Sequence, residues 1–333
     1  MWIPILLLIA GLALLWFGTD FVIESAKKLS QRFKLSHAFI GLTIVTMGTS
    51  LPEIFTTIFS SVDTLKGQPA SAVAVGVNIG SSINIMTLVV GVVAIGGVLR
   101  ATKKTLSRDG IVILLSILAL FLFGMDGTIS RAEGIILILG YFVYILFLSK
   151  DEYEAREKNP LLYEPVDAVE IKSKKLNRHP VIVILLMLFG FALLAVGSNI
   201  VVSNALKIAD AFHLTQTFVG VIILSIGGCL PELSTVFRGI GKKTHELSLG
   251  VLIGSCINDP LFSMGIGAVI SGLSFSKGLL EFELPFFALA VLVVMLLLKR
   301  NLRVERHEKK QGLVLVGLYF LFLIMKLVFF RNV

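Results

Sequence analysis

The sequence predicts an all-α integral membrane protein in which ten transmembrane helices form two five-helix repeats of opposite topology. Of the 333 residues, 56% are hydrophobic and 16% are charged, whereas soluble domains carry about 25% charged residues. Apolar runs of about 20 residues recur along the whole chain, and each can cross a bilayer as a helix. Two segments also repeat one another. These observations exclude a secreted disulfide scaffold, a disordered chain and a soluble enzyme.

The ten spans are bounded by clusters of charged residues. The first begins MWIPILLLIAGLALLWFG, which has no basic region or cleavage site, so we interpret it as a retained span. We expect helices because open sheets leave backbone groups unpaired in lipid. The expected spans are residues 2–23, 38–62, 70–98, 109–125, 132–149, 180–202, 214–238, 246–272, 281–298 and 312–330. A hydrophilic linker divides them, which predicts a first repeat at 1–149, a linker at 150–179 and a second repeat at 180–333.

The basic residues predict the orientation. The net charge of +8 lies in short loops between apolar runs, so it reports orientation and not a nucleic-acid partner. Of the 30 Lys and Arg residues, 24 fall in loops on one side and 6 on the other. By the positive-inside rule, the linker from Lys150 to His179 is cytoplasmic and both termini are outside, in a multi-pass protein of the plasma membrane.

The internal repeat has a constant register. Residues 18–59 match 197–238 at an offset of 179, which aligns Pro52-Glu53 with Pro231-Glu232. After a shorter loop the offset becomes 174 and aligns Gly80-Ser81 with Gly254-Ser255. Because each half has an odd number of spans, the second half enters the membrane the other way up. Inverted repeats of this kind are found in secondary transporters, with the substrate near the midplane.

Three acidic residues lie deep in apolar segments: Glu53, Glu232 and Asp259. A charge inside the bilayer is costly, so each is a candidate functional residue. Glu53 ends the motif GTSLPE and Glu232 ends GGCLPE. The proline in each motif breaks the helix and frees carbonyl oxygens around Thr49 and Gly228. A broken helix at membrane depth is tolerated where it lines a cavity or is buried in protein.

The two motifs together predict a cation site. Two carboxylates, with carbonyl and hydroxyl oxygens, form a hard all-oxygen site that suits Ca²⁺, which takes 6–8 oxygens. The alternative interpretation is that each glutamate caps a half-helix. Ser81 and Ser255 are candidate ligands or small packing residues.

Several enzyme classes lack their residues. All five histidines lie in or beside loops, and there is no H-E-x-x-H helix for an intramembrane zinc protease. Neither a buried Ser–His pair nor a phosphate-binding loop is evident. We therefore expect a protein that is not an enzyme and holds no cofactor, and transport driven by an ion gradient.

The motifs resemble a known family. GTSLPEIFTT with GVNIGSSIN, and GGCLPELST with GVLIGSCIND, resemble the two alpha repeats of the sodium/calcium exchanger family, in the cation/Ca²⁺ exchanger superfamily, in a prokaryotic form without regulatory domains. The resemblance implies exchange of Ca²⁺ for Na⁺ by alternating access. It implies Ca²⁺ ligands at Glu53, Glu232, Thr49 and Gly228. The implied Na⁺ ligands are Ser50, Ser81, Ser255, Thr46 and Ser225.

The sequence departs from the family pattern in both halves. Gly228-Cys229 replaces Thr-Ser, so two hydroxyls are missing. The family's asparagine falls at Ile85, and we expect Asn84, one position earlier, to face away from the site. A third carboxylate at Asp259 would leave one charge unbalanced beside bound Ca²⁺, so we predict that Asp259 is then protonated and takes part in coupling. The alternatives are an H⁺/Ca²⁺ or other divalent-cation exchanger, a cation channel and an inactive scaffold.

Overall fold

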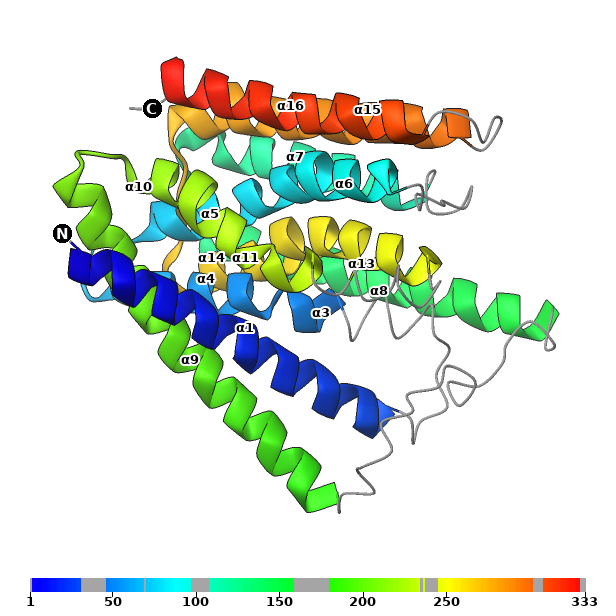
Figure 1. Ribbon diagram of the computed structural model, residues 1–333, viewed down its shortest axis with the longest axis horizontal. Coiled ribbons are helices and arrows are strands. Elements are labelled where there is room, and N and C mark those ends of the chain that lie inside the picture. Colours follow the sequence, from blue (N-terminus) through cyan, green and yellow to red (C-terminus); the bar gives the residue numbers. More distant parts are fainter. Residues whose placement is uncertain are drawn as a thin grey trace.

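The structure is a computed structural model that describes residues 2–30, 46–68, 70–96, 108–158, 180–233, 236, 245–301 and 308–329. The described part is almost entirely helical (Figure 1), as the sequence predicts. In the first half the elements are α1 (Trp2–Ser30), α3 (Thr46–Thr49), α4 (Leu51–Leu65), α5 (Ser71–Asn84), η3 (Ile85–Val89), α6 (Val90–Ile95), α7 (Gly110–Phe123), η5 (Gly124–Asp126), β1 (Thr128–Ile129) and α8 (Arg131–Lys158). In the second half they are α9 (Pro180–Ala211), α10 (Gln216–Phe218), η8 (Val219–Leu224), α11 (Ser225–Gly228), α13 (His245–Asn258), η9 (Asp259–Ser263), α14 (Met264–Ser271), β2 (Leu273–Ser274), η10 (Leu279–Glu283), α15 (Leu284–Asn301) and α16 (Glu308–Val328).

The helices account for the expected spans. Eight stretches in the described part are long and apolar enough to cross a membrane, and a shorter apolar helix covers residues 110–126. The span expected at 38–62 begins outside the described residues, and α3 and α4 are its described part. Most of the expected linker, residues 159–179, also lies outside them.

Two long spans form the centre of the molecule. In the span from α5 to α6, 83% of residues are buried, and in the span of α13 and α14, 78% are. In α8 and α9 the share is 28%. Both central spans carry small residues at their contacts, which lets neighbouring helices approach closely. These two central spans, one from each repeat, therefore form the core, and the longer helices surround them.

The pair α1 and α9 runs across the other helices at a steep angle (Figure 1). The two helices pack side by side through glycines that correspond in the repeat register. A Cβ added at Gly11 would lie 3.0 Å from the carbonyl oxygen of Gly197, and one at Gly18 would lie 2.9 Å from that of Gly190. Since larger side chains would push the backbones apart, this seam depends on glycine. It places the first helix of each half against its mate.

A π-helical turn follows each central helix. It begins at Ile85 in the first half and at Asp259 in the second, which are equivalent positions at the offset of 174. Such turns change which side of a helix the following residues face and are frequent at functional sites. A short antiparallel pair joins β1 and β2 through Thr128 and Ser274.

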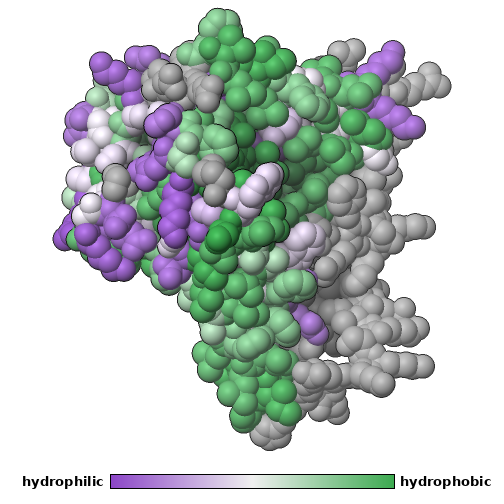
Figure 2. Space-filling model, turned by 60° about the vertical axis from the view of Figure 1, so that its left-hand side comes forward, coloured by the Kyte–Doolittle hydropathy of each residue, from purple (hydrophilic) through white to green (hydrophobic). Residues whose placement is uncertain are grey.

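The surface has an apolar flank and a polar end. Figure 2 shows hydrophobic side chains over the projecting part of the molecule and hydrophilic ones gathered toward one end. Large exposed apolar residues recur along the peripheral helices, among them Trp2, Ile9, Leu146, Leu185 and Phe320. A surface of this kind suits contact with lipid and not with water.

Candidate functional site

Both predicted helix interruptions are present, and each is confined to one residue. The first falls at Ser50, between α3 and α4. The second falls at Cys229, directly after α11. These positions correspond in the repeat register, and a proline follows two residues later in each. Helical backbone hydrogen bonds continue through each interruption. The amide of Ser50 donates to Thr46, and its carbonyl accepts from Ile54. The amide of Cys229 likewise donates to Ser225, and its carbonyl accepts from Leu233. Each motif is therefore a kinked helix and not a long unwound segment.

The two glutamates that follow the prolines are fully buried. Oε1 of Glu53 accepts a hydrogen bond of 2.8 Å from the hydroxyl of Ser81. Oε1 of Glu232 accepts one of 3.4 Å from the hydroxyl of Ser255. The Oε2 atoms of both glutamates are buried without a hydrogen-bond partner. An unpartnered buried carboxylate oxygen is costly, and a bound cation would satisfy it.

The two halves contact one another through matched pairs. The hydroxyl of Ser50 donates to that of Ser255 at 3.2 Å. At the equivalent place, Sγ of Cys229 lies 3.0 Å from Oγ of Ser81. Each kinked motif thus contacts the central helix of the opposite half, which is what the inverted repeat predicts.

Glycines allow close approach at the same crossings. A Cβ at Gly254 would lie 2.6 Å from Oγ1 of Thr46, and one at Gly80 would lie 2.8 Å from Cβ of Ser225. A Cβ at Gly228 would lie 2.5 Å from Oε1 of Glu53. The backbone of Gly228 therefore packs directly against a carboxylate oxygen of the other half.

In the first half, the residue equivalent to Gly228 is Thr49. Its side chain lies beside Glu232. The hydroxyl of Thr49 also donates to the carbonyl oxygen of Thr46 at 3.1 Å. Thr49 and Gly228 are therefore equivalent, since each lies against the glutamate of the opposite half.

Asp259 lies at the start of its π-helical turn, fully buried, and accepts a hydrogen bond of 3.4 Å from Ser82. Its Oδ1 is without a partner. The expectation for Asn84 is wrong. Its side chain donates to the hydroxyl of Ser225 at 2.9 Å, so it faces a candidate Na⁺ ligand. The equivalent Asn258 is fully buried, and its side chain lies beside the carboxyl group of Asp259.

The described side chains include no group of three or more His, Cys, Asp or Glu residues disposed as a metal centre. Coordination at this place would thus depend on two carboxylates supplemented by hydroxyl and carbonyl oxygens. Such a donor set suits hard cations, including Ca²⁺.

Sequence reasoning missed a buried ion pair. Lys326 of α16 and Glu283 of η10 are both fully buried and form a salt bridge. Phe282 stacks on Phe322 beside it, with ring centroids 5.5 Å apart. Glu283 lies near the end of an expected span, where acidic residues are common and do not by themselves indicate a site. The sequence feature that indicates this pair is Lys326, a lone cation inside an apolar run, because a buried cation requires a buried partner.

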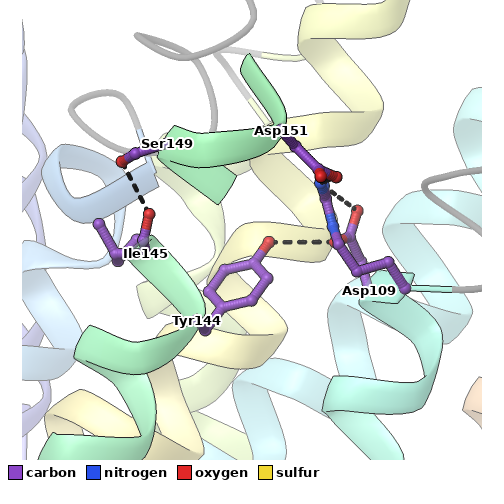
Figure 3. A network of polar contacts seen from close by, with 6 residues as sticks. Asp109, Tyr144, Ile145, Ser149 and Asp151 are labelled. Carbon is purple, nitrogen blue, oxygen red and sulfur yellow. Dashed lines mark hydrogen bonds and ion pairs between the residues drawn. The ribbon is translucent and has the colours of Figure 1, made fainter. Parts of the chain in front are cut away.

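A second network joins the beginning of α7 to the end of α8 (Figure 3). Arg108 forms ion pairs with Asp109 at 2.6 Å and Asp151 at 2.7 Å. The hydroxyl of Tyr144 donates to Asp109 at 3.3 Å. Burial alone would lower the pKa of Arg108, but the hydrogen bond and charge of Asp109 more than offset it and raise the pKa. Arg108 therefore stays charged and joins the two helices.

The inverted repeats, the kinked central motifs and the buried carboxylates define a secondary transporter of cations. The model of the sodium/calcium exchanger protein family matches residues 3–150 and 182–328. The chain therefore belongs to this family.

Relatives with similar sequences span nearly the whole chain. CaxA of Alkalimonas amylolytica is 30% identical, over 92% of this chain and 94% of its own length. The sodium/calcium exchanger MaX1 of Methanosarcina acetivorans is 25% identical, over 96% and 97%. The fold matches that of the sodium-calcium exchanger NCX_Mj with a TM-score of 0.64 and 23% identity, covering 96% of this chain and 97% of the other.

Proposed function

We propose that the protein is a secondary antiporter that exchanges Ca²⁺ for Na⁺ across the membrane by alternating access. One observation carries this proposal: Glu53 and Glu232 are fully buried at equivalent positions, and each keeps one carboxylate oxygen without a partner. A pair of carboxylates balances the charge of one Ca²⁺. We assign transport and not catalysis to this arrangement.

Calcium would be held by the carboxylates of Glu53 and Glu232 and by the backbone carbonyls of Thr49 and Gly228. The close approach of Gly228 to Glu53 supports this assignment, because it brings the backbone of one half against the carboxylate of the other. Ca²⁺ accepts mixed carboxylate and carbonyl ligands in flexible geometry.

Sodium would use the hydroxyls of Ser50, Ser81 and Ser255, with carbonyls near Thr46 and Ser225. The contacts between Ser50 and Ser255, and between Ser81 and Glu53, support overlap with the calcium site. Overlap makes the two ions compete, which is how one site couples their movements. The relatives support Na⁺ as the second ion, since MaX1 is named a sodium/calcium exchanger and NCX_Mj was studied with Na⁺ and Sr²⁺.

A second candidate is H⁺/Ca²⁺ or other divalent-cation exchange on the same fold. The sequence favours it at one place, because Gly228-Cys229 lacks two hydroxyls that would hold Na⁺. In the same half, Asp259 stands where the first half has Ile85, so a proton could take the place of a sodium ion there.

We also propose the orientation that the basic residues predict, with both termini outside the plasma membrane and the linker cytoplasmic. The halves at 1–149 and 180–333 would then open the site alternately to each side.

Calcium flux into proteoliposomes tests the proposal. An imposed Na⁺ gradient should drive Ca²⁺ uptake, and its removal should abolish it. Uptake driven by a pH gradient in the absence of Na⁺ would favour the second candidate. Flux with neither counter-ion would indicate a channel, and absence of any flux would contradict both exchange mechanisms.

A further inference from the structure

Three buried polar side chains meet close to the buried carboxyl groups. The side-chain amide of Asn78, in α5, donates to the hydroxyl oxygen of Thr57, in α4, at 2.6 Å. The hydroxyl of Ser263, in η9, donates to the same oxygen at 3.2 Å. None of the three residues is more than 1% exposed. Elements of both halves therefore meet at one oxygen, and we call these three residues the Thr57 cluster.

The Thr57 cluster lies one turn beyond two of the carboxyl groups. Thr57 follows Glu53 by four residues in α4, and Ser263 follows Asp259 by four residues in η9. Residues about one turn apart lie on the same face of a helix. The hydrogen bond between Thr57 and Ser263 therefore joins the helical turn of Glu53 to that of Asp259, across the boundary between the halves.

Asn78 connects the cluster to the central helix in the same way. It precedes Ser81 and Ser82 by three and four residues in α5. The hydroxyls of these two serines donate to Glu53 and Asp259, at 2.8 Å and 3.4 Å. The same three elements thus make hydrogen bonds at two levels, once at the carboxyl groups and once at the Thr57 cluster.

The inverted repeat shows that packing alone does not require this cluster. The three equivalent positions are apolar and at most 2% exposed. In the order Thr57, Asn78 and Ser263, they hold Val236, Leu252 and Val89. Buried polar groups lower stability unless they are hydrogen-bonded, so a polar cluster where apolar residues also pack indicates a role beyond the fold.

The two glutamates differ as the cluster predicts. Glu53, beside the Thr57 cluster, accepts from Ser81 at 2.8 Å. Glu232, in the half with apolar residues at the equivalent places, accepts from Ser255 at 3.4 Å. The carboxylate with a polar cluster behind it is therefore the one with the shorter hydrogen bond.

Resting on the proposed function, we propose that Thr57 is a positioning residue for Ca²⁺ exchange. Its hydroxyl holds the turn of Glu53 against the turn of Asp259 and so sets the Glu53 carboxylate in the geometry that binds the cation. Thr57 does not touch the ion. A ligand that is already oriented loses less conformational freedom on binding, so the cluster raises Ca²⁺ affinity. Its loss should raise the KM for Ca²⁺ and leave the maximal rate nearly unchanged, the pattern expected when binding energy alone is removed.

Two substitutions at Thr57 separate positioning from packing. Valine keeps the branched shape and removes the hydroxyl, whereas serine keeps the hydroxyl and removes the methyl group that packs on Gly267. Groups behind a metal ligand commonly change affinity by ten- to a hundredfold, so we expect Thr57→Val to weaken Ca²⁺ binding about tenfold. Titration calorimetry should show this loss, and flux in proteoliposomes should show a matching rise in KM. Thr57→Ser should bind Ca²⁺ nearly as wild type does.

Thr64→Val is the matched control for the loss of a hydroxyl from α4. Thr64 lies two turns further along the helix, and its hydroxyl donates to the backbone carbonyl of Ser60 at 2.8 Å. It should keep wild-type affinity. Affinity of Thr57→Val within about twofold of wild type, or equal losses in Thr57→Val and Thr57→Ser, would overturn the proposal and leave the proposed function intact. Failure of wild type to bind Ca²⁺ would contradict the proposed function and the role of Thr57 together.

A double variant separates positioning from stability. Thr57→Val leaves the hydroxyl of Ser263 without its acceptor, so we expect a lower melting temperature. Adding Ser263→Ala removes both partners and should restore much of the melting temperature. It should not restore Ca²⁺ affinity, because the contact between the two turns is still missing. Recovery of affinity together with melting temperature would overturn the proposal, since it would make the cluster important for stability alone.

Discussion

Replacing Glu53 by Gln removes one negative charge from the site and keeps nearly the same side-chain shape. In the structure, Oε1 of Glu53 accepts from Ser81 and Oε2 is buried without a partner. The amide can keep the first contact, but it offers one fewer acceptor to a cation. We expect Glu53→Gln to abolish Ca²⁺ transport, because the carboxylate of Glu232 alone then faces two positive charges. Glu232→Gln should behave in the same way.

The size of the effect follows from Coulomb's law. A Ca²⁺–oxygen distance of about 2.4 Å and an effective dielectric constant of about 20 give about 14 kcal/mol between Ca²⁺ and one carboxylate. Removal of water from both groups offsets most of this energy. If about a fifth remains, or about 3 kcal/mol, the affinity falls about a hundredfold.

Isothermal titration of purified protein with Ca²⁺, in buffer without Na⁺, measures this loss. Glu281→Gln is the control, since Glu281 lies two residues before the buried Glu283 but is exposed. It should bind Ca²⁺ as wild type does. Binding by Glu53→Gln within about threefold of wild type would refute the reasoning, because a ligand to the ion cannot be that dispensable.

Four further predictions follow from other parts of the structure. Gly228→Thr should weaken Ca²⁺ binding about tenfold or more without lowering the melting temperature. The reason is that the new Cβ would lie 2.5 Å from Oε1 of Glu53 and would displace this flexible carboxylate. Unchanged Ca²⁺ affinity by titration would contradict this. Glu283→Gln should lower the free energy of unfolding by about 3–5 kcal/mol, because it removes the carboxylate that pairs with buried Lys326. The double variant with Lys326→Gln should regain part of this stability in thermal unfolding. Strictly additive losses would argue against the pair. Asp259→Asn should retain Ca²⁺ binding but change the pH profile of exchange, and identical profiles with unchanged rates would reduce Asp259 to a structural role. A cysteine in the linker between Lys150 and His179 should resist an impermeant reagent in intact cells, and labelling from outside would reverse the proposed orientation.

The paired motifs were predictable because membrane burial leaves few explanations for an acidic residue. Pro52 and Pro231 indicated where the helices break, and the constant register indicated that Glu53 and Glu232 are equivalent. The structure confirms both interruptions at equivalent positions. Apolar length alone was sufficient to predict the helical membrane fold.

Other features depend on geometry that residue spacing does not determine. A rotation of about 100° per residue along an ideal helix suggested that Asn84 faces away, but the helix and its neighbours place its amide on Ser225. The pairing of Glu283 with Lys326 joins two elements far apart in the sequence. The contact between Cys229 and Ser81 likewise requires knowledge of how the two halves cross.

Reversal of the sodium gradient tests the central claim most directly. In proteoliposomes that contain wild-type protein, high internal Na⁺ should drive Ca²⁺ inward, and high external Na⁺ should drive it outward. Glu53→Gln should move Ca²⁺ in neither direction. Ca²⁺ movement that follows its own gradient alone, whichever side holds Na⁺, would contradict exchange at a shared site.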